Sequence, residues 1–200
     1  MSLSFRFGTV GSPNSTPRSG SANAAAFMPA LGLSALELGW VRSVRVSKKT
    51  CAEIKAAAVE NDVAISVHAP YYINLNGDDE EWPKSRKRLM DAAHYGHLSG
   101  ADYVVFHPGS YGGKAPDEVW APVKDRLRGC VDELREAGNP IILRPETMGK
   151  QGQLGSLEDC LQIATMIKGV EPCLDFAHLH ARPGDGSMNS RKEWLEVLDR

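Results

Sequence analysis

The chain has 200 residues, of which 42% are hydrophobic, and this is enough apolar material for one sizeable core. Its formal net charge of -2 and its pI near 6.3 argue against a protein that grips nucleic acid through a broad basic surface. An anionic ligand would need positive charge that is supplied locally.

The predicted strands are six short apolar runs that alternate with longer amphipathic segments. They cover residues 4–10, 35–41, 63–68, 103–107, 140–146 and 172–177. Their spacing of roughly thirty to forty residues is that of a repeated strand and helix unit. The pattern therefore predicts an α/β fold around a parallel sheet.

Three of the intervening helices carry local signals. Segments 50–53 ("TCAE") and 156–159 ("SLED") match capping boxes, so we expect helices to begin at Thr50 and Ser156. Between residues 119 and 134, apolar residues recur every three or four positions, and Gly138 stands where a left-handed helix end favours glycine. One face of this helix should pack on the core.

The four cysteines lack any CxxC spacing, and three of them fall in helix-like segments as small apolar residues. The N-terminus has no basic leader followed by a long apolar run. We therefore expect a cytoplasmic protein with no membrane contact.

Potential metal ligands stand at the ends of four successive predicted strands. They are His68, His107, Glu146 and Asp175, with His178 just beyond. In parallel α/β barrels the C-terminal strand ends converge on one face, so these side chains should meet. A lone histidine there is usually structural and a lone acid is often a helix cap, but the set together needs a shared partner.

A divalent cation is the simplest partner for such a set. Mixed nitrogen and oxygen ligands suit Zn²⁺ best, with Mn²⁺ or Fe²⁺ as alternatives. Glu146 offers two oxygens and could bridge a first ion held by His68 and His107 to a second held by Asp175. Two such ions would suit the hydrolysis of a phosphodiester, which makes Glu146 the expected catalytic residue.

Other polar residues have open assignments. His94 and His97 lie on a predicted helix and are most simply surface residues, whereas His180 stays open. Arg144 and Arg182 could contact phosphate or could balance nearby acids.

Four motifs occur in an order that resembles the endonuclease IV family: "VHAPYYINL", "FHPGSY", "ETMGKQGQLGSLEDC" and "CLDFAHLHAR". The resemblance implies a TIM (β/α)8-type barrel with up to three zinc ions that cleaves double-stranded DNA on the 5' side of abasic sites. It implies that His68 and His107 bind the first zinc, Glu146 bridges the first and second, and Asp175 binds the second. His178 would bind the third zinc, and Tyr72 would lie near the DNA.

The chain departs from the family pattern in two motifs and in its number of strands. Thr9 stands where the family has a histidine, and the loop after the second strand lacks the family's asparagine-glutamine and tryptophan signature. Its basic residues Arg42, Arg45, Lys48 and Lys49 are equally compatible with phosphate contacts and with a solvated loop. We also expect about six of the eight strands, so that residues 1–200 form one barrel domain without strands seven and eight.

Three functions remain open at this point. The first is a zinc-dependent apurinic/apyrimidinic endonuclease, a monomer if the chain is complete. The second is a sugar isomerase or epimerase of the related xylose-isomerase-like barrels, with one Mn²⁺ or Mg²⁺ held by Glu146 and Asp175. The third is a truncated barrel that binds DNA without cutting it.

Overall fold

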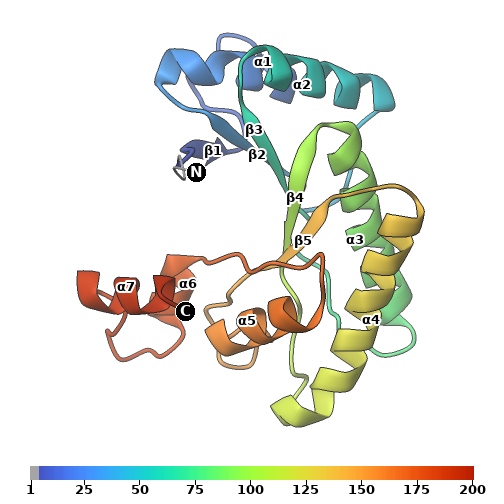
Figure 1. The fold of residues 1–200 in the computed structure, drawn as a ribbon, viewed down its shortest axis with the longest axis vertical. Coiled ribbons are helices and arrows are strands. Elements are labelled where there is room, and N and C mark those ends of the chain that lie inside the picture. The colour runs from blue at the N-terminus through green and yellow to red at the C-terminus, as the bar shows by residue number, and fades with distance from the viewer. Residues whose placement is uncertain (1–4) are drawn as a thin grey trace.

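A computed structural model of the protein describes residues 5–200, and in this range five parallel strands form one sheet in chain order (Figure 1). The strands are β1 (Gly8–Val10), β2 (Ala35–Gly39), β3 (Ala64–His68), β4 (Ala101–Phe106) and β5 (Ile142–Pro145). The helices are α1 (Ser21–Phe27), α2 (Lys48–Glu60), α3 (Glu81–Leu98), α4 (Pro116–Glu136), α5 (Leu157–Met166), α6 (Phe176–Ala181) and α7 (Arg191–Leu198), with a 3₁₀ turn η1 (Met28–Leu31) after α1.

The core lies between one face of the sheet and the helices that cover it. Alternate strand residues such as Leu36, Val67 and Leu143 are almost fully buried there, together with the apolar faces of α2, α3 and α4. Because side chains alternate across a strand, the opposite face receives Glu37, His68 and their register partners. This inner face therefore carries polar residues toward one end of every central strand.

The prediction of a regular sixth strand at residues 172–177 is wrong. Residues 169–173 run parallel to β5 and make two isolated bridges, Leu143 with Val170 and Glu146 with Cys173. Between these bridges, Pro145 stands where the ladder needs a backbone N–H, and proline has none. The segment therefore follows the sheet edge without completing a strand, and α6 begins at Phe176.

Of the two predicted capping boxes, one is confirmed and the other is wrong. The box at Ser156 is confirmed, because its hydroxyl accepts from the Asp159 amide and Asp159 accepts from the Ser156 amide. The box at Thr50 is wrong: Ser47 caps α2 three residues earlier and accepts the Thr50 amide at 3.0 Å. Gly138 has the predicted left-handed backbone, with φ 69°, just after α4.

The predicted helical stripe is also confirmed. The five apolar residues that defined it are all buried on one face of α4: Val119, Val123, Leu127, Cys130 and Leu134.

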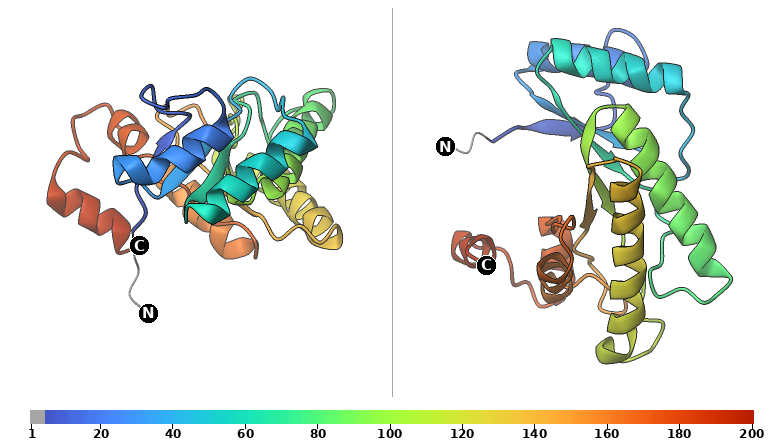
Figure 2. Two further views of the ribbon diagram at one scale, coloured as in Figure 1. Left: turned by 90° about the horizontal axis from the view of Figure 1, so that it is seen from above. Right: turned by 45° about the vertical axis from the view of Figure 1, so that its right-hand side comes forward.

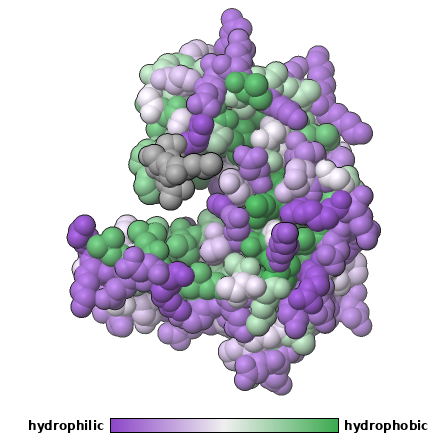
Figure 3. Space-filling model, in the orientation of Figure 1, coloured by the Kyte–Doolittle hydropathy of each residue, from purple (hydrophilic) through white to green (hydrophobic). Residues whose placement is uncertain are grey.

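Over the described residues 5–200, the five strands do not close into a complete barrel. The first predicted strand started at residue 4, which lies outside the described residues, and β1 covers only Gly8–Val10. Figure 2 shows α6 and α7 standing apart from the main helical layer. In Figure 3 this C-terminal arm projects from the body of the molecule, and its upper surface is largely apolar. The molecule is thus a partial barrel with an open side.

Within residues 5–200, no helix combines the length and the apolar character that crossing a bilayer requires.

Candidate metal centre

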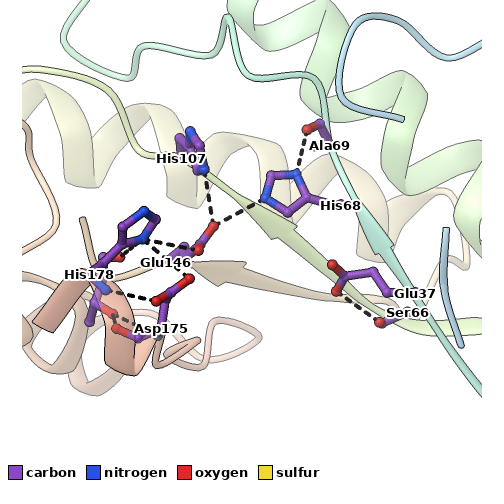
Figure 4. A network of polar contacts seen from close by, with 9 residues as sticks. Glu37, Ser66, His68, Ala69, His107, Glu146, Asp175 and His178 are labelled. Atoms are coloured by element: carbon purple, nitrogen blue, oxygen red, sulfur yellow. Dashed lines mark hydrogen bonds and ion pairs between the residues drawn. The ribbon is translucent and has the colours of Figure 1, made fainter. Parts of the chain in front are cut away.

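The five predicted ligands lie together at the C-terminal ends of neighbouring strands on the inner face of the sheet (Figure 4). His68 is the last residue of β3, while His107 and Glu146 directly follow β4 and β5. Asp175 and His178 come from the start of α6. They form two groups that share Glu146, His68–His107–Glu146 and Glu146–Asp175–His178, with ligand atoms within 4.8 Å in each group.

Glu146 lies at the centre of the cluster. One carboxylate oxygen, Oε2, is 3.1 Å from the Nε2 atoms of both His68 and His107. The other oxygen, Oε1, is 3.3 Å from Nδ1 of His178. The side chain of Glu146 is only 8% exposed, so its charge depends on these imidazoles rather than on water.

These contacts shift the pKa values of Glu146 and His68. Burial alone would raise the pKa of Glu146, but the hydrogen bonds and charges of His107 and His68 outweigh it and hold that pKa well below its usual value. Burial alone would lower the pKa of His68, but its contacts with Glu146 and with the Ala69 carbonyl raise it overall. These contacts thus favour the carboxylate form of Glu146 and the protonated form of His68.

The tautomer of His68 follows from its neighbours. Its Nδ1 lies 2.8 Å from the Ala69 carbonyl oxygen, and a carbonyl only accepts, so Nδ1 carries a proton. The other nitrogen, Nε2, is directed at Glu146 and is the atom that a metal would use. A histidine whose second nitrogen is fixed by a carbonyl is the usual arrangement around protein-bound metals.

Asp175 and His178 are linked through the start of α6. Asp175 Oδ1 caps the helix by accepting the His178 amide at 2.8 Å, while Oδ2 lies 3.5 Å from His178 Nδ1. That Nδ1 also donates to the Thr147 carbonyl at 2.9 Å. Asp175 thus caps a helix and still directs one oxygen toward the cluster.

The two predicted substrate residues lie beside the cluster in different environments. Tyr72 is 66% exposed and lines a surface pocket of about 480 Å³ that reaches His107. The guanidinium of Arg182 donates to backbone carbonyls of the loop after β5, those of Met148, Lys150, Gln151 and Gln153. Arg182 therefore holds this loop in place, and direct contact with substrate remains a prediction for both residues.

Other candidates lie away from the ligand groups. His94 and His97 are on α3, and exposed His180 pairs its Nδ1 with the Ser187 carbonyl oxygen. Arg144 pairs with Glu171 and lies over the ring of Tyr103. Thr9 is in register with Leu36, on the strand face that packs against the helices.

Two residues near the site were not predicted from the sequence. The ring of Tyr71 stacks on His107, with ring centroids 4.9 Å apart and an interplanar angle of 15°. Glu37, on β2, accepts a hydrogen bond from Ser66 at 3.1 Å; burial raises the pKa of Glu37, and the nearby charge of His68 opposes this. The sequence did contain a signal for Glu37, because it stands between Leu36 and Leu38. Since these two leucines are buried in the core, alternation places Glu37 on the inner face of the strand.

The donor set fits a divalent metal. Three imidazoles and two carboxylates lie together in two groups that share Glu146. A buried carboxylate among imidazoles is costly unless a charged partner compensates it, and a cation is such a partner. Nitrogen and carboxylate oxygen together are ligands of Zn²⁺, Mn²⁺ and Fe²⁺.

Several known proteins resemble this chain in sequence or in fold. The sequence profile of the family described as "Xylose isomerase-like TIM barrel" matches residues 25–199. The chain belongs to this family. An uncharacterized protein of Methanocaldococcus jannaschii is 31% identical over 97% of this chain and 69% of its own length.

Endonuclease IV of Thermus thermophilus is a second relative. Its sequence from one strain is 31% identical over 92% of this chain and 67% of its own length. The crystal structure of the protein from another strain superimposes with a TM-score of 0.72 at 27% identity, over 97% of this chain and 70% of that one. These matches confirm the predicted resemblance to the endonuclease IV family.

The same fold also occurs in sugar epimerases. D-psicose 3-epimerase from Clostridium cellulolyticum superimposes with a TM-score of 0.72 at 14% identity, over 96% of this chain and 69% of that one. At this identity the likeness concerns the fold alone. The same fold thus occurs in an endonuclease and in an epimerase, so the chemistry has to be argued from the site.

The charge pair predicts the pH dependence of stability of the metal-free protein. The lowered pKa of Glu146 contributes stability above its unfolded value near 4.3, and this contribution is lost as the pH falls. The raised pKa of His68 contributes stability below about pH 6.5, and this contribution is lost as the pH rises through the folded pKa. Urea unfolding with a chelator should therefore show greatest stability between about pH 5 and 6.5.

In the variant His68→Asn, the free energy of unfolding should no longer decline as the pH rises above about 6.5. In His94→Asn, on the exposed face of α3, the decline should remain. A flat profile for the unmodified protein between pH 5 and 9 would contradict the expected protonation of His68.

Proposed function

We propose that this chain is a zinc-dependent phosphodiesterase that cuts DNA on the 5' side of abasic sites, and that it acts in DNA repair in the cytoplasm. The observation that carries the proposal is one buried carboxylate, Glu146, shared by two groups of potential metal ligands. The similarity to endonuclease IV at about 30% identity supports the substrate class. All four cysteines are free thiols, which fits a reducing compartment.

His68, His107 and Glu146 would hold a first ion and Glu146 and Asp175 a second. His178 would serve a third ion through Nε2, as the family resemblance implies, because its Nδ1 donates to the Thr147 carbonyl. Two bound divalent cations supply the positive charge that a phosphodiester needs as negative charge develops on its attacking and leaving oxygens. They would also provide the local positive charge that the acidic composition lacks. Zn²⁺ is favoured by the three imidazoles, with Mn²⁺ or Fe²⁺ as substitutes.

The protein's own groups would position the DNA strand. The pocket beside His107 presents Tyr71 and Tyr72, which are about half and two thirds exposed, together with Arg88 and Gln153. An exposed tyrosine offers a stacking surface for a base next to the lesion, and a guanidinium offers a phosphate contact. We assign Tyr72 to the first role, in line with the family resemblance.

More distant phosphates have a second candidate surface. Four exposed basic residues follow β2 and start α2: Arg42, Arg45, Lys48 and Lys49. Lys49 approaches Glu53 at 3.9 Å across one helical turn, and such exposed pairs are weak enough to exchange for phosphate.

The chain spans 69% and 67% of the length of the two relatives described above. Metal ligands or substrate contacts that these relatives supply from outside the matched segments are not assigned to this chain. The activity, the metal count and the monomeric state therefore stand as proposals for the 200 residues.

The test is a nicking assay on a duplex oligonucleotide that carries one abasic site. Protein stripped with a chelator and reloaded with Zn²⁺ should cut the strand on the 5' side of the site and leave a 3'-hydroxyl. An undamaged duplex and the stripped protein are the controls. Metal content and size in solution should be measured on the same sample. Failure to cut with Zn²⁺, Mn²⁺ or Fe²⁺, in protein that is folded and loaded, would exclude the proposed activity.

A sugar epimerase is the second candidate. It is favoured by the polar inner face below the cluster, where the Glu37–Ser66 pair could contact hydroxyl groups. The two functions differ in the need for His107, because an epimerase requires one ion held mainly by Glu146 and Asp175. One ion per chain, unchanged in His107→Ala, would support the epimerase, and loss of an ion in that variant would support the phosphodiesterase.

A third outcome is binding without cleavage. If loaded protein shifts the abasic duplex in a gel but never nicks it, the chain is a DNA-binding partial barrel.

A further inference from the structure

Thr147 occupies a central place in the candidate metal centre without being a potential ligand. It directly follows Glu146 and is fully buried. Its hydroxyl accepts the Asp175 amide at 2.9 Å and donates to the Asp175 carbonyl at 3.2 Å. Its own carbonyl accepts Nδ1–H of His178 at 2.9 Å. One residue thus contacts both members of the Asp175–His178 pair.

The backbone pairing explains why the hydroxyl is needed. Alongside β5, the Cys173 amide donates to the Pro145 carbonyl and the Thr147 amide donates to the Cys173 carbonyl. In a regular parallel ladder, the next bond would run from the Asp175 amide to the Thr147 carbonyl. Here that amide donates to the Thr147 side chain instead. The carbonyl that the ladder would have used is left free for His178.

We infer that Thr147 is a positioning residue. Its hydroxyl, in place of its own carbonyl, accepts the hydrogen bond of the Asp175 amide. The carbonyl, which is left free by this exchange, accepts Nδ1–H of His178 and fixes that ring. The exchange has two consequences. The backbone of Asp175 is held in both directions, which sets the direction of its carboxylate. The proton of His178 is held on Nδ1, which leaves the Nε2 lone pair for a ligand.

The inference rests on the proposed metal site for its consequence, but its structural part can be tested without metal. In chelated wild-type protein, ¹⁵N NMR of the imidazole should show neutral His178 protonated on Nδ1. An Nε2–H tautomer in the wild-type protein would overturn the inference. This measurement does not depend on how well any variant folds.

The variant Thr147→Val keeps the shape and removes the hydroxyl. In this variant the Thr147 carbonyl is the only acceptor left for the Asp175 amide. Because that carbonyl would no longer be free for His178, His178 should lose its preference for Nδ1–H. Binding of the ion that His178 would hold through Nε2 should weaken about 10- to 100-fold, as is usual when a group that orients a ligand is lost. Binding by His68, His107 and Glu146 should change less than about threefold.

Two further variants serve as matched controls. Thr147→Ser retains the hydroxyl and should keep both the wild-type tautomer and the binding of the ion held by His178. Thr165→Val makes the same change at an exposed threonine of α5, whose hydroxyl donates to the Gln162 carbonyl, and should leave both unchanged. Wild-type tautomer and metal content in Thr147→Val would overturn the inference. A wild-type protein that binds no metal would instead remove the proposed function, while the tautomer measurement would still decide the role of Thr147.

Discussion

Replacing Glu146 with glutamine is expected to remove metal from both ligand groups at once and to reduce DNA cleavage to background. Glutamine has nearly the same shape, but it carries no negative charge and its NH₂ group cannot be a ligand. Since Glu146 belongs to both groups, one substitution takes a ligand from each. The apparent metal affinity should fall by at least about 100-fold, because even the loss of a group that merely orients a ligand costs 10- to 100-fold.

The metal-free protein gives an independent measure of the same change. In Glu146→Gln the imidazoles of His68 and His107 face a neutral amide in place of a carboxylate. The raised pKa of His68 should fall, since the charge that favours its protonation is gone. Consequently the stability maximum between about pH 5 and 6.5 should flatten.

The matched control is Glu158→Gln on α5. Glu158 is exposed and pairs with Arg200, well outside the two ligand groups. Metal content from mass spectrometry, nicking rates and urea unfolding should all match the wild-type protein, within about 1 kcal/mol for the unfolding free energy. If Glu146→Gln kept the full metal content, Glu146 would not be the shared ligand.

The sequence predicted this cluster because its geometry depends on the fold class more than on local detail. In a parallel sheet, the strand ends meet at one edge, so residues as far apart as His68 and Asp175 could be expected to converge. The apolar alternation of the strands and the stripe on α4 were also readable, because burial imposes a period of two or of 3.6. These parts required no knowledge of long-range contacts.

The parts that were missed depend on single contacts. Pro145 was included in a predicted strand, yet its missing N–H interrupts the pairing of the next segment. Tyr71 and Tyr72 are adjacent in the sequence, and the path of the loop after Pro70 decides which ring stacks on His107. Arg182 has a side chain long enough to reach four carbonyls, and the sequence does not reveal whether it reaches protein or substrate. Each of these outcomes is fixed by tertiary structure alone.

Gly155 is the position at which one added methyl group should do the most damage to the site. Its φ is +123°, a conformation that residues with a side chain rarely adopt, and it is buried. A Cβ atom there would lie 2.8 Å from the backbone oxygen of Glu146 and 2.8 Å from the side chain of Met148. The oxygen belongs to the backbone that carries the shared ligand and cannot rotate away as a side chain can.

Gly155→Ala should therefore cost about 2–5 kcal/mol of stability, from backbone strain and overpacking together. Because the strain falls on the Glu146 backbone, metal content should drop as well, and both effects can be followed by urea unfolding and metal analysis. Gly152→Ala is the matched control in the same loop: it is exposed, no atom lies within 4 Å of its added Cβ, and its φ is ordinary. That variant should stay within about 0.5 kcal/mol of wild type. Equal stability and metal content in the two variants would mean that the loop after β5 relaxes freely, and Glu146 would then owe its position to the imidazoles rather than to the backbone beneath it.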